Sequence, residues 1–167
     1  MTELVLDLAP PGADSTPCED CGAPLGGRSG CDRAFHALGA RAVGDAAFAH
    51  RRRAVVDAYS LQHSAYIRSV KSLAAHLCGL CAAVERPADP RASRAIWSEL
   101  SVPPDAAKPA LPIRTAERTL ADVMRAPAGE FSAAVDAWIE AVWAAWSAHH
   151  ELARAWLDYS IANLPRR

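Results

Sequence analysis

The chain has 167 residues, of which 51% are hydrophobic and 22% are charged. This length is typical of one domain, and the composition allows a hydrophobic core and excludes a chain that is disordered throughout. The 18 basic and 19 acidic residues leave a formal net charge of −1. The sequence therefore lacks the basic excess of nucleic-acid and anionic-membrane binders, and we expect neither partner.

The chain contains no run of 18 apolar residues, so no transmembrane helix is predicted. Its first residues, MTELVLDLAPPGAD, carry acidic groups where a signal peptide has basic residues and an apolar stretch. These features predict a cytoplasmic location. In that compartment the five cysteines are expected to be thiols or metal ligands before they are disulfides.

The segment 1–31 is rich in Pro and Gly and contains three of the five cysteines. We expect it to be irregular, because such a composition favours turns. An irregular segment buries little apolar surface, so another source of free energy is needed to order it.

From Asp32 onward the sequence has capping residues, and apolar residues recur at the 3.6-residue spacing of helices. The segment 65–86 shows this most clearly, with a stripe that runs from Tyr66 to Val84. The final segment has an apolar arc wide enough to contact two neighbouring helices. We expect helices over 33–43, from Asp45 to about His63, and over 65–86, 116–125 and 130–163, with a short helix around Ile96, Trp97 and Leu100.

No segment alternates between polar and apolar residues with a period of two, which is the pattern of a half-buried strand. The sequence therefore predicts an all-α fold: a helical bundle over 32–167 with an irregular, Cys-bearing metal-binding loop over 1–31. A proline-rich connector is expected over 87–114. We expect these parts to form a single domain.

Cys18 and Cys21 form a C-x-x-C pair that is followed by Gly22, and Cys31 comes ten residues later. Two thiolates at this spacing can bind one ion from a tight turn, and a loop rich in Gly and Pro suits that geometry. Zinc fits best, because it prefers tetrahedral Cys and His ligands. A redox dithiol of the thioredoxin type would need a strand followed by a helix, which this sequence does not predict.

A fourth ligand is required, and sequence spacing favours His36. The alternative interpretation is that His36, which falls in the predicted helix 33–43, faces solvent and binds no metal. The more distant candidates are His50, His63 and His76. On a continuous helix His50 and Asp57 share a face but lie two turns, about 10.5 Å, apart, so they can line one cavity but would rarely bind one ion together. His76 lies at the edge of an apolar stripe, where a histidine that only packs is the alternative interpretation.

His149 and His150 fall within the apolar, Trp-rich stripes of the last predicted helix. Burying an imidazole there is unfavourable unless the ring is hydrogen-bonded or binds a metal. We expect one of the two to have a functional role. Cys78 and Cys81 form a second C-x-x-C pair within a predicted helix, and we expect both to be core residues.

The motifs together resemble an uncharacterised bacterial family of unknown function. The shared pattern is C-x-x-C-G-A, a further Cys before a Phe, H…V-D-A-Y-x-x-Q-H, a His–Leu pair and W-x-x-W-x-x-H-H. Where that family usually has a proline after the Gln–His pair, this sequence has Ser64. The number of helices and the late histidine pair are also similar to DinB/YfiT-like bundles, which bind a metal through histidines from different helices, although the Cys loop does not belong to that pattern.

Two functional hypotheses follow. In the first, the chain is a small metalloenzyme that acts on a small polar substrate: Cys18, Cys21 and Cys31 bind zinc or a similar divalent ion, and His36, His63 or His76 completes the site. Its catalytic candidates are His50, Asp57, His63 and His150. In the second, a closed zinc site only joins the N-terminal loop to the bundle. A redox sensor that uses the cysteines as switches is a third and weaker hypothesis.

Overall fold

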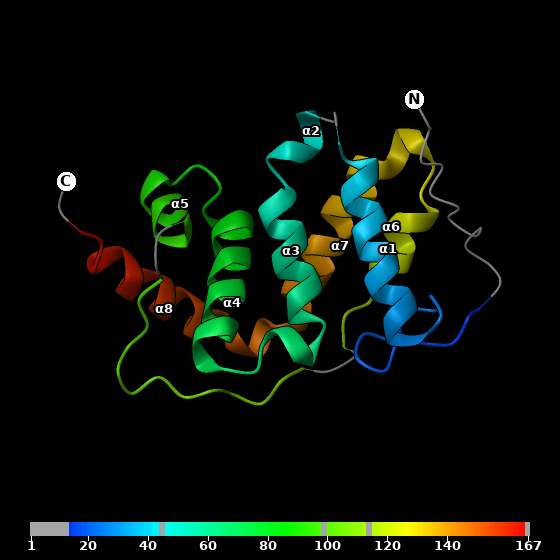
Figure 1. Cartoon of the computed structure of the whole chain (residues 1–167). Helices are drawn as coiled ribbons and strands as arrows, with labels where there is room; N and C mark the ends of the chain where they lie inside the picture. The colour runs from blue at the N-terminus through cyan, green and yellow to red at the C-terminus, as the bar shows by residue number, and fades with distance from the viewer. Residues whose placement is uncertain (1–13, 44–45, 98–99, 113–114, 166–167) are drawn as a thin grey trace, which may run out of the picture.

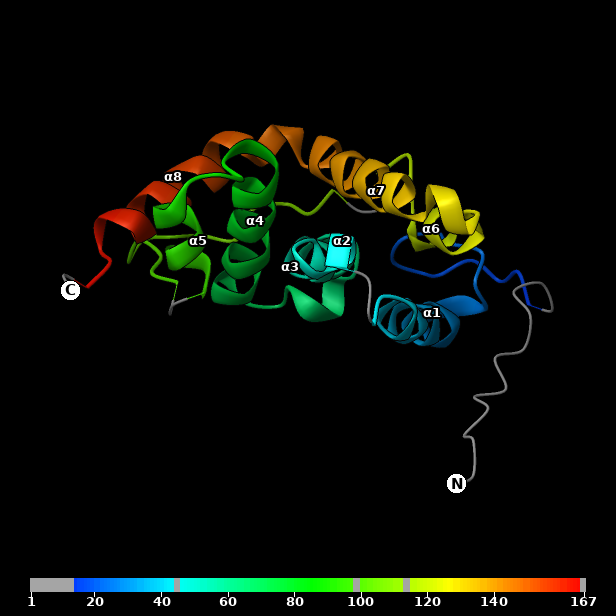
Figure 2. The same ribbon diagram turned by 90° about the horizontal axis from the view of Figure 1, so that it is seen from above.

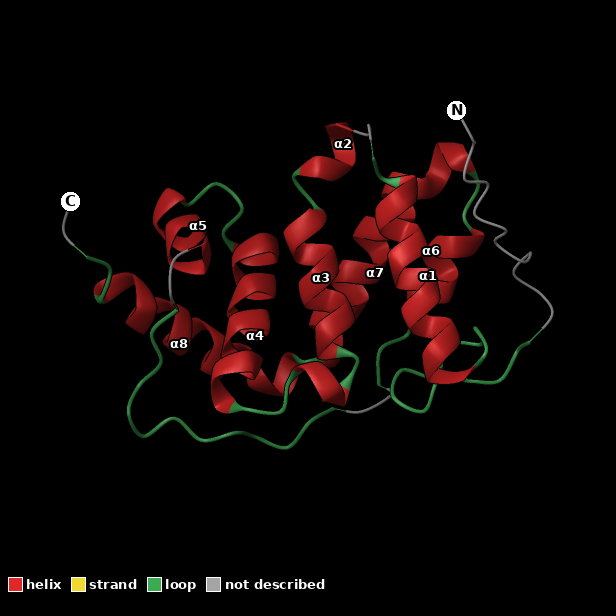
Figure 3. Ribbon diagram, in the orientation of Figure 1, coloured by secondary structure: helices red, strands yellow, loops and turns green. Residues whose placement is uncertain are grey.

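The computed structural model describes residues 14–43, 46–97, 100–112 and 115–165. Within these ranges the fold is all-α, and the one strand-like feature is an isolated bridge between Pro17 and Pro24 (Figure 3). None of the helices described is long and apolar enough to span a membrane. The α-helices are α1 (Gly27–Arg41), α2 (Ala46–Ala49), α3 (Arg52–Leu61), α4 (Val70–Glu85), α5 (Pro90–Trp97), α6 (Leu120–Arg125), α7 (Phe131–Ala145) and α8 (His150–Ala162).

The helices lie in two layers. Helices α1, α3 and α4 stand side by side (Figure 1). Seen from above, α7 and α8 pass across one side of this row (Figure 2). Helix α3 packs against α4 and α7, and α4 also packs against α8. Helix α6 joins α1 to α7, so that the N-terminal helix is connected to the second layer.

The core between the layers consists of large apolar side chains from both. Trp138 and Val142 of α7 are fully buried, and so are Leu73 and Leu77 of α4. The indole N–H of Trp138 donates to Gln62 Oε1 at 2.9 Å, which satisfies its polar atom at the edge of the core. The apolar stripe predicted for α4 therefore faces the second layer, as its spacing requires.

Helix α1 begins six residues before the predicted start at residue 33, so Asp32 lies within the helix and does not cap it. The cause is a turn that the spacing analysis missed. Gly26 and Gly27 have positive φ angles, and both of their N–H groups donate to the carbonyl of Thr16. These contacts end the irregular loop at Gly26 and place Cys31 on the helix.

The helix predicted from Asp45 to about His63 is divided into α2 and α3, and residues 44–45 lie outside the described part of the chain. The helix predicted over 65–86 starts later, at Val70. Its N-cap Ser69 exchanges hydrogen bonds with Ser72 in a capping box, which fixes the start. Tyr66 therefore lies outside α4 and is 43% exposed, so its assignment to the apolar stripe was wrong.

The long helix predicted over 130–163 is also wrong, because the chain forms α7 and α8 with a short 3₁₀ turn at Ser147–His149 between them. At the break the carbonyl of Trp143 accepts from the backbone N–H of Trp146 at 3.0 Å and also from His150 Nε2 at 2.9 Å. The same imidazole stacks on the Trp143 ring, with 3.9 Å between the centroids. The His150 side chain thus adds a second hydrogen bond to a carbonyl at the end of α7.

The two shorter helices also differ from the sequence expectation. Helix α5 covers Pro90–Trp97 and ends before Leu100. Helix α6 covers Leu120–Arg125 and starts at a capping box formed by Thr119 and Asp122, so it is shorter than the predicted 116–125.

A buried polar contact joins α3 to α4. Asp57 of α3 is fully buried, and its carboxylate accepts from Arg53 Nε at 2.8 and 3.0 Å and from His76 Nδ1 at 2.9 Å. Gly79 of α4 faces this carboxylate, because a Cβ atom there would lie 2.1 Å from Asp57 Oδ2. The absence of a side chain at Gly79 is what allows the two helices to enclose the carboxylate.

We expect two Gly→Ala substitutions within helices, one at this contact and one away from it, to change the free energy of unfolding in opposite directions. Gly79→Ala should lower the free energy of unfolding by about 1–3 kcal/mol, because the added methyl group overlaps the buried carboxylate. Gly39→Ala in α1, where a Cβ atom has no neighbour within 4 Å, should raise it by about 0.5–1 kcal/mol through helix propensity. Urea unfolding of both variants measures the difference, and a stabilised Gly79→Ala protein would contradict the packing described.

Candidate metal centre

The described part of the N-terminal loop folds into a tight turn around the first two cysteines. Cys18 N–H donates to the carbonyl of Ala23 at 2.8 Å, and Gly22 N–H donates to the carbonyl of Cys18 at 2.9 Å. Gly22 has a φ of 78°, which a residue with a side chain rarely adopts. Within this turn backbone N–H groups hydrogen-bond to the sulfur atoms of Cys18 and Cys21. The turn therefore directs both sulfur atoms to the same side.

Cys31 belongs to the second turn of α1, and the loop passes directly over that turn. A Cβ atom at Gly30 would lie 1.6 Å from the carbonyl oxygen of Leu25. Only glycine permits this approach, and it brings Cys31 Sγ to 3.7 Å from Cys21 Sγ. The third cysteine thus completes a cluster that the C-x-x-C turn begins.

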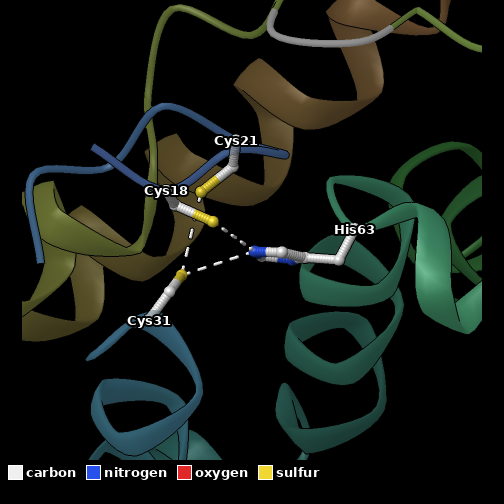
Figure 4. A group of neighbouring side chains, drawn as sticks. All are labelled: Cys18, Cys21, Cys31 and His63. Carbon is white, nitrogen blue, oxygen red and sulfur yellow. Dashed lines mark hydrogen bonds between the residues drawn. The ribbon is translucent and has the colours of Figure 1, made fainter. Parts of the chain in front are cut away.

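His63 lies two residues after the end of α3 and approaches the cluster from the opposite side (Figure 4). Its Nδ1–H donates to the backbone carbonyl of Tyr59 at 2.6 Å, and its ring packs on the Tyr59 ring with 4.1 Å between centroids. Because Nδ1 carries the proton, the lone pair of the neutral imidazole is on Nε2, which faces the sulfur atoms. Nε2 lies 3.4 Å from Cys31 Sγ and 3.6 Å from Cys18 Sγ.

These distances match the edges of a tetrahedral zinc site. Bonds of about 2.3 Å to sulfur and 2.0–2.1 Å to nitrogen place two sulfur ligands about 3.8 Å apart and a sulfur and a nitrogen about 3.5 Å apart. The ligand atoms of Cys18, Cys21, Cys31 and His63 all lie within 4.8 Å of one another, and all four residues are buried. The four side chains are therefore close enough to bind one metal ion.

The electrostatics of the cluster favour a cation. The hydrogen bond shared between Cys21 and Cys31 lowers the pKa of the Cys21 thiol to about 4 and raises the pKa of the Cys31 thiol. Burial raises the pKa of the Cys18 thiol. Without a cation, the thiolate of Cys21 therefore opposes ionisation of its two neighbours, whereas a bound divalent ion would allow all three sulfur atoms to be thiolates.

Polar contacts around the cluster fix the loop against the end of α3. Asp20 lies between the two loop cysteines, and its Oδ1 accepts from the backbone N–H and the hydroxyl of Ser64, which follows His63. Arg28 forms ion pairs with Asp20 and Asp32, and the Tyr59 hydroxyl donates to Asp32. Each ligand-bearing segment is thus connected to another by at least one hydrogen bond outside the cluster.

The other histidines that the sequence offered as ligands lie elsewhere. His36 is exposed on α1, although sequence spacing favoured it as the fourth ligand. His76 donates to Asp57, and that carboxylate therefore orients His76 rather than a histidine of the cluster. His50 lies outside α3, and its Nε2 accepts from Arg51. Among the described residues, none of the three joins the Cys cluster.

His149 and His150 each donate from Nε2 to a backbone carbonyl, those of Ala110 and Trp143, at 2.9 Å. The structure thus gives both a packing partner, and neither lies in the Cys cluster. Cys78 and Cys81 are fully buried, which confirms their prediction as core residues. Burial also raises the pKa of both thiols, that of Cys81 to about 11, so they remain protonated.

Two further residues, Tyr59 and Asp20, position the site. Tyr59 precedes His63 by four residues, which is the spacing at which a side chain at a helix end can reach a carbonyl one turn back. Asp20 is one of the two residues between Cys18 and Cys21. The contact of His63 with the carbonyl of Tyr59 could be predicted from spacing, whereas the contact of Asp20 with Ser64 depends on the tertiary fold.

The fold and the cluster define a class: an all-α protein in which an N-terminal Cys turn and a histidine at the end of a helix form a candidate Cys₃His metal centre. The chain belongs to the family of unknown function DUF5946, whose model matches residues 16–147. All four candidate ligands fall within the matched part. No curated protein and no solved structure matches the chain.

Substitution of single histidines tests which one completes the site. His63→Ala should weaken zinc binding by more than about 100-fold, because loss of a residue that only orients a ligand already costs about 10–100-fold. His36→Ala and His76→Ala are matched controls and should keep the wild-type affinity. Competition titration with a chromogenic chelator measures all three, and an unchanged affinity in His63→Ala would remove this residue from the site.

Proposed function

We propose that the chain is a zinc-binding protein in which one ion, bound by Cys18, Cys21, Cys31 and His63, fixes the N-terminal loop and α1 to the end of α3. The observation that carries this proposal is the agreement of three ligand–ligand distances, 3.4, 3.6 and 3.7 Å, with tetrahedral zinc geometry.

The donor set supports zinc over other ions. Three thiolates and one imidazole are soft or borderline ligands, whereas magnesium and calcium require oxygen atoms. An iron–sulfur cluster needs several iron atoms between its ligands, and ligand atoms this close leave room for a single ion.

The arrangement supports a structural role for the ion. Four protein ligands complete a tetrahedral shell, and a structural zinc site is closed in this way, whereas a catalytic site keeps one position for water or substrate. The ligands are also at most 6% exposed. Structural zinc in zinc-finger peptides supplies about 10–16 kcal/mol of apparent binding free energy, which is sufficient to order an irregular loop.

The metalloenzyme hypothesis needs an open coordination position and is tested by the same measurements. X-ray absorption of the zinc-loaded protein should fit three sulfur atoms and one nitrogen, and cobalt-substituted protein should give the visible spectrum of a tetrahedral thiolate site. A shell that includes a water oxygen would instead favour the enzyme.

Removal of the metal tests the structural role. The purified protein should contain about one zinc ion per chain, and extraction with a strong chelator should lower Tm by about 10 °C or more, because each kcal/mol lost shifts Tm by about 2–4 °C at this size. The Cys78→Ala/Cys81→Ala variant is the matched control and should retain its zinc. A metal-free protein with an unchanged Tm would refute the proposal.

Zinc binding should also weaken in acid. The raised pKa values of the Cys18 and Cys31 thiols mean that zinc must displace protons from them near neutral pH, so lowering the pH favours the thiol form and opposes binding. Calorimetric titration in buffers of different ionisation enthalpy measures the protons released. An affinity that does not change between pH 8 and about pH 6 would contradict thiolate coordination.

A further inference from the structure

A cleft of about 500 Å³ lies between α3, α4, α5 and α7, apart from the Cys cluster. None of the four candidate zinc ligands lines it. Helices α4 and α5 stand to one side of α3, and α7 lies behind α3 (Figure 1). A cleft of this volume is in the range that binds small molecules.

The floor and sides of the cleft are apolar. Ala54, Gly79 and Ala82 are buried and small, so a ligand can approach the backbones of α3 and α4 closely. Ile96 of α5 and Ile139 of α7 are 8% and 7% exposed and form facing sides. A flat apolar body would be removed from water on several sides here.

An exposed tryptophan stands at the rim. Trp97 is 71% exposed, whereas the other four tryptophans are at most 6% exposed. It is the last residue of α5, and its ring centroid lies 5.9 Å from the guanidinium carbon of Arg53. The Trp97 ring is therefore a large aromatic surface that is not packed in the core and lies next to an arginine and a cleft. Such a surface is suited to binding a ligand.

Arg53 is held in a fixed orientation. Its Nε donates to both oxygens of the buried Asp57, and its Nη2 donates to the carbonyl of Ala75 at 3.1 Å. Its Nη1 has no acceptor among the described residues. An arginine that a buried carboxylate orients from one side offers its remaining N–H groups to an anion at little entropic cost.

More basic than acidic side chains line the cleft, and each of its three arginines is paired with one carboxylate. The basic residues are His50, Arg51, Arg53 and Arg86, and the acidic ones are Asp136 and Glu140. Asp136 is paired with Arg51. The carboxylates that pair with Arg53 and Arg86, those of Asp57 and Asp158, are not part of the lining. Glu140 at the exposed rim is therefore the one acidic lining residue without an arginine partner among the described residues.

We propose that this cleft binds a small organic anion with a flat apolar body, which packs between Trp97 and the small residues of the floor while its anionic group binds Arg53. The site is distinct from the zinc proposal, because none of the four candidate zinc ligands lines the cleft, although α3 borders the cleft and leads to His63. Either proposal can fail without the other.

Three probes of matched shape test the charge preference: 2-naphthoate, 2-naphthylmethanol and 2-naphthylmethylammonium. Zinc-loaded protein is titrated with each by calorimetry, with ligand-observed NMR for weak binding. Naphthoate should bind about tenfold or more tightly than the other two, because a charge-assisted hydrogen bond contributes about 1.5–3 kcal/mol. Absence of naphthoate binding, or equal binding of the ammonium compound, would overturn the proposal.

Two pairs of variants locate the binding. Ala83 is an exposed cleft residue of α4, and Ala155 is an exposed residue of α8 outside the cleft. Ala83→Phe should abolish naphthoate binding by filling the space, whereas Ala155→Phe should leave it unchanged. Equal binding by the two variants would place the ligand elsewhere and refute the site.

Arg53→Gln should weaken naphthoate binding by about tenfold or more. The neighbouring Arg52 is exposed and does not line the cleft, so Arg52→Gln should leave naphthoate binding unchanged. Equal affinity of these two variants would remove Arg53 from the proposal. Because Arg53 also pairs with buried Asp57, circular dichroism checks the fold of its variant, and if that variant is unfolded the Ala83 and Ala155 pair decides.

Discussion

The cluster in which the His63 imidazole contacts the sulfur atoms of Cys18 and Cys31, and Cys31 contacts Cys21, is the constraint on which the N-terminal third of the molecule depends. The irregular loop contributes only a few buried side chains, among them Cys18, Cys21 and Ala23, and two of these are candidate ligands. Its ion pair between Arg28 and Asp20 is only partly buried, and such contacts contribute little to stability. In the part of the chain that the structure describes, the cluster joins the loop, α1 and the end of α3 in the interior.

Helix α3 connects this cluster to the rest of the molecule. Its C-terminal end presents His63, and its middle carries Asp57, whose burial is tolerated because Arg53 and His76 both donate to it. The same Arg53 faces the cleft between α4, α5 and α7. Helix α3 thus supplies groups to the buried polar contact with α4 and to the cleft, and the segment that directly follows it supplies His63 to the candidate metal centre.

The sequence was sufficient to predict an all-α fold, the three cysteines as a cluster and the core position of Cys78 and Cys81, because each depends on local spacing. It was not sufficient to choose His63 over His36. That choice depends on where α1 begins and where α3 ends, and residue spacing predicts neither. The start of α1 is set by the hydrogen bonds of Gly26 and Gly27 to the Thr16 carbonyl, and the end of α3 is held by the contact of Ser64 with Asp20.

The division of the last helix was missed for a related reason. The apolar pattern continues through the break, and the His150 side chain adds a hydrogen bond to the carbonyl of Trp143 there. The cleft could not be predicted at all, because its lining residues come together only when α3, α4 and α5 pack with α7, which is more distant in sequence. Tertiary contacts, rather than propensities, decide these features.

The order of the four candidate ligands along the chain has a consequence for biosynthesis. Cys18, Cys21 and Cys31 leave the ribosome first, and His63 follows 32 positions after the third cysteine. At ordinary rates of translation this interval lasts on the order of seconds. During it the nascent chain presents three thiol groups without the imidazole, so any zinc they acquire is accessible to exchange with cellular thiols. In the proposed site, durable binding requires that α3 has been synthesised and that the carbonyl of Tyr59 holds His63 with Nε2 toward the sulfur atoms.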